Sequence, residues 1–494
     1  MDETHPLLRP SDTCWRIETA DRLSVIIDAA DYFALLREVM QKARHSVIMI
    51  GWEFDTRISL DPRDGNEDVP ERLGRFLSWL VCKNPDLDIR LLQWDVGLLQ
   101  TLGRGSTPLQ IADWLLGRKI RLKLDHAHPT GAAHHQKIIV IDDVLAFCGG
   151  IDATADRWDT RDHREDDPYR VRPTTKRPYG PWHDATVAVD GDAARALGEL
   201  ARARWNDATG ETMEPPPAAP PIWPEGLVPM LRDVDVAISR TMPAHAGRDA
   251  VAEIETLYLE VIAAAEHTLY IESQYFASRL LAEAIIARLA EPDGPEIVVV
   301  NPESAQGWLE EGAMGSARAR LLEMIRKADP HDRFRIYAPV NEAGTPIYVH
   351  AKIVIMDDRL MRVGSSNLNN RSLGFDTECD LSVEARPGMP GEAGIRAQID
   401  GLRTSLLTEH LRVDRQAVER ALEAKDGSLI GAIESLRRDD GSLVPFVPPD
   451  FDGVEDALLR ENELFDPEPP APRWRRGRLS RLRRRIPGGA SAGA

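Results

Sequence analysis

Two copies of one pattern, His-x-Lys-x-x-x-x-Asp, carry the side chains of this chain that are best suited to chemistry. The first copy spans residues 135–142 and the second spans residues 350–357. Side chains two residues apart in a strand point to the same side, so each copy offers an imidazole beside an ammonium group. A single copy would be a weak signal, but two copies in matching surroundings indicate a site. Its candidate residues are His135, Lys137, Asp142, His350, Lys352 and Asp357.

The surroundings of the two copies match in register. Gly149 and Gly364 each follow the histidine of their copy by 14 residues, after an apolar stretch. Upstream, residues 45–54 and residues 267–276 are similar, and each segment leads from a histidine into an apolar run. These coincidences predict an internal duplication with a period of roughly 220 residues, which fits a repeated domain and is too long for a solenoid repeat.

Two imidazoles and two ammonium groups around one cavity suffice for phosphoryl transfer without a metal or another cofactor. Because an imidazole has an unperturbed pKa of about 6.5, one ring can attack phosphorus while the other, protonated, donates to the leaving group. The attack gives a phosphohistidine and divides one difficult displacement into two easier steps. The two lysines and an amide donor would stabilise the negative charge on the phosphate oxygens.

The elements that must position these groups are short apolar strands alternating with helices. This pattern predicts an α/β sheet covered by helices on both faces. The predicted strands are residues 47–50, 89–92, 138–141, 187–189, 269–271, 297–300 and 353–356. The predicted helices are residues 30–43, 109–116, 193–205, 251–265 and 316–327. Residues 160–181 lack periodicity and are expected to form a long surface loop, and loops of this length are often functional, for example as lids.

A proline-rich stretch between the two motif copies predicts the domain organisation. Residues 208–224 can neither continue a helix nor join a sheet interior. We therefore predict a first domain over residues 1–207, a linker over 208–224, a second domain over 225–412, a helical segment over 413–440 and a flexible tail over 441–494.

The net charge of −19 on the 494 residues is unevenly placed. Residues 473–494 hold eight arginines and no acidic residue, so the other 472 residues carry −19 − 8 = −27. An acidic body repels DNA, whose non-specific binding rests on phosphate neutralisation, and nucleic acid is therefore not an expected partner. The segment from Arg473 to Arg485 either docks on anionic lipid at a membrane surface or is a solvated end.

The remaining composition predicts a soluble monomer. Four scattered cysteines without CxxC spacing suit a reducing compartment. The acidic N-terminus lacks the order of a secretory signal, and no apolar stretch approaches the roughly 18 residues that cross a bilayer. We expect a cytoplasmic protein that can lie at the membrane surface, with export that leaves no classical signal as the alternative.

The duplicated motif resembles the hallmark of the phospholipase D superfamily. The resemblance covers about residues 20–410 and extends to Ile50-Gly-Trp-Glu-Phe-Asp55, to Ile271-Glu-Ser-Gln-Tyr-Phe276 and to Pro181-Trp-His-Asp184. It implies two tandem homologous domains, each a mixed β-sheet flanked by helices. A pseudo-twofold axis would relate these domains and place one shared active site between them.

The resemblance also assigns roles. His135 is expected to be the nucleophile, and His350 the general acid and then the base for water. Asp142 and Asp357 resemble structural partners more than proton carriers. The residues expected to bind phosphate are Lys137, Lys352 and Asn367.

Two further carboxylates are expected to orient the histidines. Glu378 follows His350 by 28 residues, where family members place such a carboxylate, and Asp159 is the matching candidate for His135, with Asp162 as a near competitor. Asp152 stands where the second copy has Asn367, and a carboxylate repels a phosphodiester unless a lysine pairs with it. We therefore do not expect Asp152 to bind phosphate, and a structural role is favoured for His183.

The resemblance implies a phospholipase D that hydrolyses glycerophospholipids of the phosphatidylcholine kind to phosphatidate and a head-group alcohol, with transfer to another alcohol as a further activity. The alternatives are a phosphatidyltransferase of the cardiolipin synthase kind, then a nuclease of the family, and from a different class a non-catalytic membrane-binding protein. Degenerate members of the last kind typically lose a motif histidine or lysine, and this sequence keeps all four.

Overall fold

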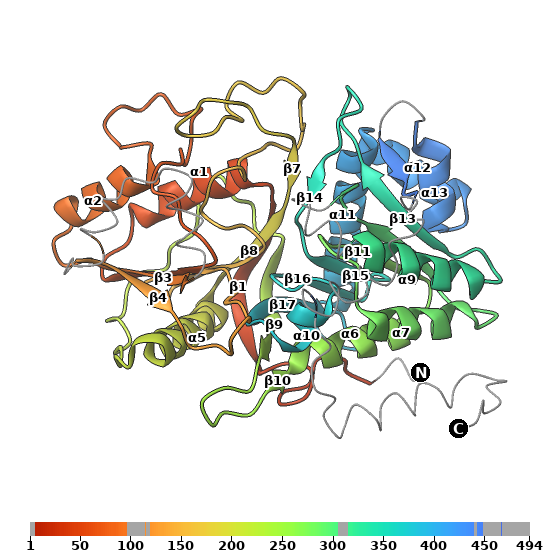
Figure 1. The fold of residues 1–494 in the computed structure, drawn as a ribbon, viewed down its shortest axis with the longest axis horizontal. Helices are drawn as coiled ribbons and strands as arrows, with labels where there is room; N and C mark the ends of the chain where they lie inside the picture. Colours follow the sequence, from red (N-terminus) through yellow and green to blue (C-terminus); the bar gives the residue numbers. More distant parts are fainter. Residues whose placement is uncertain are drawn as a thin grey trace.

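The centre of the molecule is one large mixed sheet with helices on its faces (Figure 1). The structure is a computed structural model that describes residues 5–95, 114, 119–304, 315–438, 442–447 and 466. The predicted mixed α/β class is confirmed. The sequence suggested one sheet for each domain, whereas a single sheet runs through both halves of the chain.

The elements fall into two halves and a C-terminal group. The first half comprises β1 (Arg16–Ile27), α1 (Ala29–Met40), β2 (Ser46–Gly51), α2 (Leu73–Lys83), β3 (Asp88–Trp94), β4 (Ile120–Asp125), β5 (Ile138–Ile141), β6 (Leu145–Gly149), β7 (Trp182–His183), β8 (Ala185–Asp190) and α5 (Gly191–Thr209). The second half comprises β9 (Leu231–Met242), β10 (Val251–Ala252), α6 (Glu253–Ala264), β11 (Thr268–Glu272), α7 (Arg279–Leu289), β12 (Glu296–Val300), α9 (Ser316–Lys327), β13 (Phe334–Pro339), β14 (Tyr348–Val349), β15 (Ile353–Met356), β16 (Leu360–Gly364), α10 (Asn370–Gly374), β17 (Glu378–Glu384) and α11 (Glu392–Leu411). The C-terminal group comprises α12 (Arg415–Ala424), α13 (Leu429–Leu436) and β18 (Leu443–Pro445).

The two halves meet at the middle of the sheet, where the long strands β1 and β9 pair antiparallel. Outward from β1 the order is β8, β6, β5, β2, β3 and β4, and outward from β9 it is β17, β16, β15, β11, β12, β13 and β18. In both directions the outer strands β2–β3–β4 and β11–β12–β13 are parallel and the inner ones antiparallel. A duplication would produce this shared order, and the duplication itself stays a prediction.

Alternation within the strands explains why helices cover both faces. In β2, Val47 and Met49 pack under α1 and α2, whereas Ile48 and Ile50 point to the opposite core against α5. In the second half α6 and α7 cover one face and α11 to α13 the other (Figure 1). A strand that is apolar at every position fits a sheet that is buried on both sides.

Most of the predicted elements are present. All seven predicted strands lie within β2, β3, β5, β8, β11, β12 and β15, and four of the five predicted helices correspond to α1, α5, α6 and α9. Residues 251 and 252 were predicted as helix but form β10, because they pair with the end of β9. The predicted helix over 109–116 lies outside the described residues, except for Trp114.

The C-terminal region is described only in part. The helices α12 and α13 lie in the segment that was predicted to be helical. Of the predicted tail, only residues 442–447 and 466 are described, so the arginine-rich segment lies outside the described residues. None of the helices that the structure describes has the length and apolar character needed to span a membrane.

The motif glycines have a steric reason. A Cβ on Gly364 would lie 2.5 Å from Asp380 Cα on the neighbouring strand, and a Cβ on Gly149 would lie 2.6 Å from Ala185 O. In each half the strand after the motif therefore approaches its neighbour too closely for any side chain.

We predict that Gly364→Ala lowers the free energy of unfolding by roughly 1–3 kcal/mol, because the added methyl group forces β16 away from β17. Urea unfolding monitored by circular dichroism measures this loss. Gly65→Ala is the matched control, since nothing lies within 4 Å of a Cβ there. Equal unfolding midpoints for the two variants would contradict the steric explanation.

Candidate active site

Each motif histidine lies directly before a short buried strand, which fixes the direction of the following lysine. His135 and Lys137 precede β5, and His350 and Lys352 lie between β14 and β15. Each lysine ammonium donates a hydrogen bond to the carbonyl oxygen of its own motif histidine, 3.0 Å for Lys137. The predicted pairing of an imidazole with an ammonium group on one side of the chain is therefore present in both copies.

Each imidazole is held by a carboxylate from the opposite half. His135 Nδ1 lies 2.9 Å from Glu378 Oε2, and His350 Nδ1 lies 2.6 Å from Asp184 Oδ2. The backbone follows the same exchange, because the amide of His135 donates to Thr377 O at 3.0 Å and the amide of His350 to the carbonyl before Asp184 at 2.7 Å. With Nδ1 engaged, Nε2 is the ring nitrogen that can meet a substrate.

The sequence assignment of these carboxylates was wrong. Glu378 was predicted to orient His350, but it orients His135. Asp159 was predicted for His135, but it accepts hydrogen bonds from His163 at 3.0 Å and from Arg170 at 3.1 Å. Asp162, the competitor, is exposed and pairs with Arg164.

The reason lies in the sheet register. Gly364 pairs with Asp380 and Gly149 with Thr186, so Glu378 and Asp184, each two residues earlier, occupy equivalent places in the two halves. Parallel pairing of β14 with β7, and of His134 with Thr377, then brings each carboxylate to the other half's histidine. The loop between Asp159 and Asp184 lengthens the first half, so spacing alone pointed to Asp159.

The two lysines have different partners. Lys137 forms a 3.0 Å ion pair with Asp152, which also accepts a hydrogen bond from the amide of Trp52. Lys352 instead lies 3.4 Å from the amide oxygen of Gln274, and within the described ranges no carboxylate forms an ion pair with it. Asn367 is buried, and its Oδ1 has no hydrogen-bond partner among the described side chains and backbone.

The motif aspartates are not with the histidines, although the motif grouped them with the catalytic candidates. Asp142 accepts backbone hydrogen bonds from residues 44–46 at 2.7–2.8 Å, and Asp357 accepts them from residues 266–268 at 2.7–3.0 Å. They lie at the far ends of β5 and β15, roughly 20 Å along the chain from the histidines at about 3.3 Å per residue. Their role is structural, because they fix the chain entering β2 and β11.

Comparisons with known proteins point to one family. A family model described as "Cardiolipin synthase, PLD-like domain" matches residues 258–390. Phospholipase D A of Dictyostelium discoideum is 25% identical over 456 residues, which are 79% of this chain and 34% of that protein. Phospholipase D alpha 1 of Oryza sativa subsp. japonica is 24% identical over 512 residues, which are 76% of this chain and 62% of that protein.

The chain is therefore similar to proteins of the phospholipase D superfamily over about three quarters of its length. It spans about one third to two thirds of the length of these curated relatives. The crystal structure of phosphatidylserine synthase from Haemophilus influenzae Rd KW20 has a similar fold, with a TM-score of 0.54 at 13% identity over 84% of this chain and 96% of that one.

The electrostatics differ between the two histidine–carboxylate pairs. Burial raises the pKa of Glu378 to about 8, against hydrogen bonds from Ser365 and Ser372 and the charge of Lys137. At Asp184 burial acts in the same direction, but the charge and hydrogen bond of His350 outweigh it and lower the pKa to about 2. The pair at His350 therefore contains an ionised carboxylate, and the pair at His135 contains a carboxyl group that is mostly protonated at neutral pH.

The lysines complete this contrast. Burial, followed by the charges of Lys137 and Lys352, lowers the pKa of His135 well below its usual value, so this imidazole is neutral. Burial also lowers the pKa of Lys352 to about 7, because Asp184 offsets only part of the cost and Lys137 adds repulsion. These mutual effects require the two motif copies to lie close together in one site.

Aromatic rings flank both imidazoles, and none of them was assigned a role from the sequence. Trp52 meets His135 edge-on with ring centroids 5.1 Å apart, and Trp182 lies 5.2 Å from His350 and stacks on Tyr348 at 4.6 Å. Both tryptophans belong to the segments that carried the family resemblance. In the sequence each tryptophan stands directly before a polar residue of its segment, and this was the only signal that it lies beside a motif histidine.

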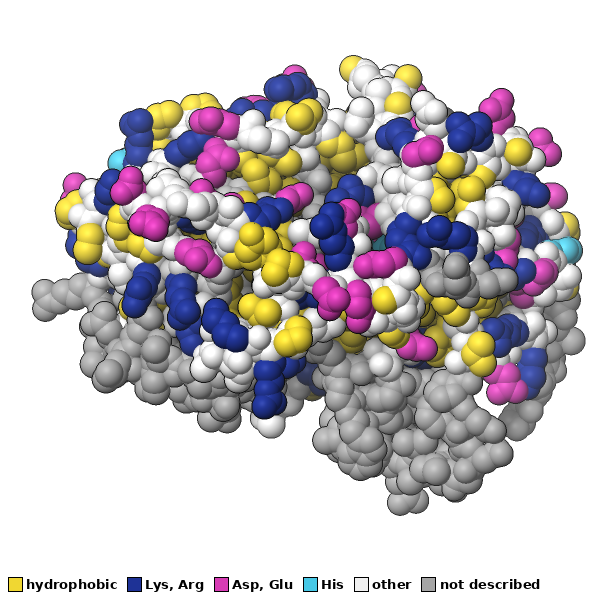
Figure 2. Space-filling view, turned by 90° about the horizontal axis from the view of Figure 1, so that it is seen from above, with side chains coloured by type: hydrophobic (Ala, Val, Ile, Leu, Met, Phe, Trp, Pro, Cys, Tyr) yellow, Lys and Arg dark blue, Asp and Glu magenta, His cyan; other side chains and the backbone are white. Residues whose placement is uncertain are grey.

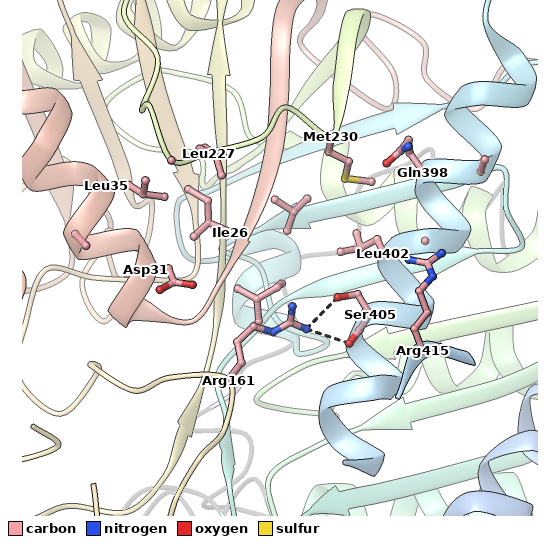
Figure 3. Close-up of a pocket in the computed structure, with 16 residues that line it drawn as sticks. Ile26, Asp31, Leu35, Arg161, Leu227, Met230, Gln398, Leu402, Ser405 and Arg415 are labelled. Atoms are coloured by element: carbon pink, nitrogen blue, oxygen red, sulfur yellow. Dashed lines mark hydrogen bonds between the residues drawn. The ribbon is translucent and has the colours of Figure 1, made fainter. Parts of the chain in front are cut away.

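Two cavities lie outside this constellation. The larger, of about 630 Å³, lies between α1, β1 and α11 and contains none of the motif residues (Figure 3). The smaller, of about 250 Å³, is lined by Trp182 and Tyr348 and thus opens beside His350. Of these two cavities, the smaller is the nearer to His350, whose ring lies 5.2 Å from that of Trp182.

We predict that Glu378→Gln changes how stability depends on pH. The unfolded carboxyl titrates near 4.5 and the native one near 8, so the stability that protonated Glu378 contributes is present below pH 4.5 and lost as the pH rises toward 8. Glutamine does not titrate, and the variant should gain roughly 2–4 kcal/mol relative to the natural protein between pH 5 and pH 8.

Urea unfolding of both proteins at these two pH values measures the gain. Glu323→Gln, which replaces an exposed carboxylate on α9, should leave the difference between the two pH values unchanged. Parallel stability curves for Glu378→Gln and the natural protein would show that Glu378 is ionised in the native state at neutral pH.

Proposed function

We propose that this chain is a phospholipase D-type phosphodiesterase that hydrolyses glycerophospholipids of the phosphatidylcholine kind to phosphatidate and a head-group alcohol. One observation carries the proposal: two histidines, each oriented by a carboxylate of the opposite half, share a buried site with two lysines. The proposal also includes that the two halves arose by duplication, that a pseudo-twofold axis relates them, and that they share a single active site.

In the proposed first step, Nε2 of neutral His135 attacks the phosphorus of the diester. The bond from phosphorus to the head-group oxygen breaks, and His350 donates a proton to that oxygen. In the second step His350 takes a proton from water, the hydroxide attacks phosphorus, and the bond to His135 breaks to release phosphatidate. Burial and the charge of Lys352 lower the pKa of His350 well below its usual value, and the ionised carboxylate of Asp184 opposes this shift and would stabilise the cationic form that both steps require.

The same asymmetry supports the assignment of phosphate ligands. Lys137 is already neutralised by Asp152, whereas Lys352 has the amide oxygen of Gln274 beside it. Asn367 would donate to a phosphate oxygen through Nδ2, because its buried Oδ1 can only accept a hydrogen bond. An anionic diester would supply Lys352 with the negative partner that the second half lacks, and its charge would favour the protonated ammonium. Stabilising the oxygens in this way is worth most in a water-excluded site.

The small cavity beside His350 supports a cationic head group. Its lining includes the rings of Trp182, Tyr348 and Tyr179 and the carboxylates of Asp156 and Glu303. Aromatic faces attract quaternary ammonium groups, and Asp156 and Glu303 add negative charge, although Arg172 pairs with Asp156 at 3.0 Å. The Arg157 guanidinium already lies 4.2 Å from the centroid of the Trp182 ring, so a choline group would have to displace it or bind beside the other rings.

The face seen from above argues against a nucleic-acid substrate. Figure 2 shows basic and acidic side chains interspersed over the part of this face that the structure describes. A nuclease would favour a continuous basic track for the phosphate backbone. The proposed substrate is therefore a lipid.

A second candidate, transfer of the phosphatidyl group to another alcohol, has specific support. The family model that matches residues 258–390 is described as cardiolipin synthase, and the crystal structure with the similar fold is a phosphatidylserine synthase. The same phosphohistidine would serve either reaction, and the acceptor alone decides the product.

We predict that His135→Asn and His350→Asn each lower choline release from phosphatidylcholine vesicles at least roughly 1,000-fold, since each removes a participant in both steps. The assay is run without added metal. His331→Asn, which replaces an exposed histidine before β13, is the matched control and should retain full activity. Equal release by all four proteins would sink the mechanism, and nucleotide release from DNA without choline release would favour the nuclease.

We also predict that added glycerol diverts part of the product from phosphatidate to phosphatidylglycerol, because an alcohol can replace water in the second step. Thin-layer chromatography of labelled lipid at rising glycerol concentrations measures the ratio. A ratio that stays at phosphatidate alone would identify a strict hydrolase. Product that forms only when an alcohol is present would identify a phosphatidyltransferase.

A further inference from the structure

A second buried polar cluster lies behind His350, away from the attacking nitrogens. Four of its members converge on one point, and we call them the inner cluster: Asp28, His163, His183 and Glu409. Their side chains are at most 3% exposed. The proposed reaction uses none of them, and no metal was expected from the sequence.

The spacing of the inner cluster is that of ligands around an ion. His163 Nε2 lies 3.6 Å from Asp28 Oδ2 and 3.2 Å from Glu409 Oε1. His183 Nδ1 lies 3.3 Å from Asp28 Oδ1 and 2.7 Å from the same Glu409 oxygen. Tetrahedral zinc with bonds of about 2.0–2.1 Å separates its ligand atoms by about 3.3 Å. Three of these four distances are close to the expected length and the 2.7 Å distance is shorter, and each histidine faces a different oxygen of Asp28.

Two of these atoms have no hydrogen bond. His183 Nδ1 and Asp28 Oδ2 are buried without a hydrogen-bond partner in the part of the chain that the structure describes, although acidic or imidazole atoms lie nearby. An unsatisfied buried polar atom typically costs about 1–3 kcal/mol. Both atoms face the centre of the inner cluster, where an ion would satisfy them together.

The outer nitrogens of the two histidines complete the pattern. His163 Nδ1 lies 3.0 Å from Asp159, and His183 Nε2 lies 2.8 Å from Glu272. Metal-binding histidines almost always donate their other ring N–H to such a carboxylate, which fixes the ring and the tautomer. Arg170 in turn holds Asp159, so the outer shell is itself anchored.

We propose that Asp28, His163, His183 and Glu409 bind a divalent transition-metal ion of the zinc type. Two imidazoles and two carboxylates in tetrahedral spacing suit zinc, whereas calcium and magnesium prefer all-oxygen sites with more ligands. The complete burial of the four side chains makes the site structural, with no open position for a substrate.

The ion would secure the carboxylate that orients His350. The amide of Asp28 donates to Asp184 O at 2.8 Å, and the amide of Asp184 donates to Asp28 Oδ1 at 3.0 Å. The ion would also join the halves, because Glu409 lies on α11 and the other ligands lie in the first half. Arg161, which reaches Ser405 on α11 in Figure 3, pairs with Glu409 from the outside.

Protons are the competing occupant of this cluster. Burial lowers the pKa of His163, but Asp28, Asp159 and Glu409 raise it to about 10, and the same kind of environment raises the pKa of His183. Two imidazolium ions could therefore balance the carboxylates, with Arg161 and Arg170 beside them, as two neutral imidazoles and one divalent ion also would. The two states differ in metal content, which can be measured directly.

The full chain, produced without a histidine tag in zinc-supplemented medium and desalted, should contain about one zinc ion per molecule by plasma mass spectrometry. His163→Gln and Asp28→Asn should reduce this content at least about tenfold, because each removes one of the four ligands. His128→Gln, which replaces a histidine that contacts Asp95, is the control and should keep the ion. Cobalt in place of zinc should give the intense visible absorption of a tetrahedral site.

A folded natural protein that contains no zinc, and whose thermal midpoint is unchanged by added Zn²⁺ after chelator treatment, would overturn the proposal in favour of the protonated cluster. Variants that fold and retain the ion would overturn it as well. If the variants do not fold, the metal content and the Zn²⁺-dependent midpoint of the natural protein still decide. None of these readouts uses lipid, so their outcome is independent of the phospholipase assay.

Discussion

The active site depends on an exchange across the sheet, in which each half supplies the carboxylate that orients the other half's imidazole. Neither His135 nor His350 has its orienting partner within its own half, so neither half forms a complete site alone. The exchange works only because β1 and β9 fuse the halves into one sheet and short parallel contacts bring Thr377 and His183 beside the opposite motif. The long central strands β1 and β9 therefore determine how the two histidine–carboxylate pairs are placed, although neither strand contributes a residue to those pairs.

The two halves share one strand order, but the groups around the two histidines differ at a few positions. Asp152 neutralises Lys137, whereas Asn367 leaves Lys352 without a carboxylate partner in the described ranges. Glu378 is surrounded by hydroxyl groups and holds its proton to about pH 8, whereas Asp184 faces His350 and is ionised. In the proposed reaction these differences would suit His135 to attack and His350 to transfer protons.

The sequence predicted what local pattern and repetition determine. Apolar runs placed β2, β5, β11 and β15, and the repeated motif singled out the histidines and lysines. The carboxylate assignment failed because spacing along the chain carries no information about a partner that arrives from the other half. The strands β1 and β9 were not predicted, because charged residues such as Glu18 and Asp235 interrupt their apolar pattern. The burial of Glu272 against His183 was not predicted either, because the residue at the matching place in the first half is the apolar Ile50.

Burial explains both the reactivity of the site and its need for support. Removing water strengthens each electrostatic contact, but it also makes every unpaired charge costly. The motif aspartates contribute to this support although they lie far from the histidines, because they accept hydrogen bonds from the backbone that enters β2 and β11. The inner cluster supports the other carboxylate, because Asp28 forms hydrogen bonds with both the amide and the carbonyl group of Asp184. A buried histidine can therefore be oriented without a carboxylate from its own half, provided that the carboxylate of the other half is itself held by hydrogen bonds.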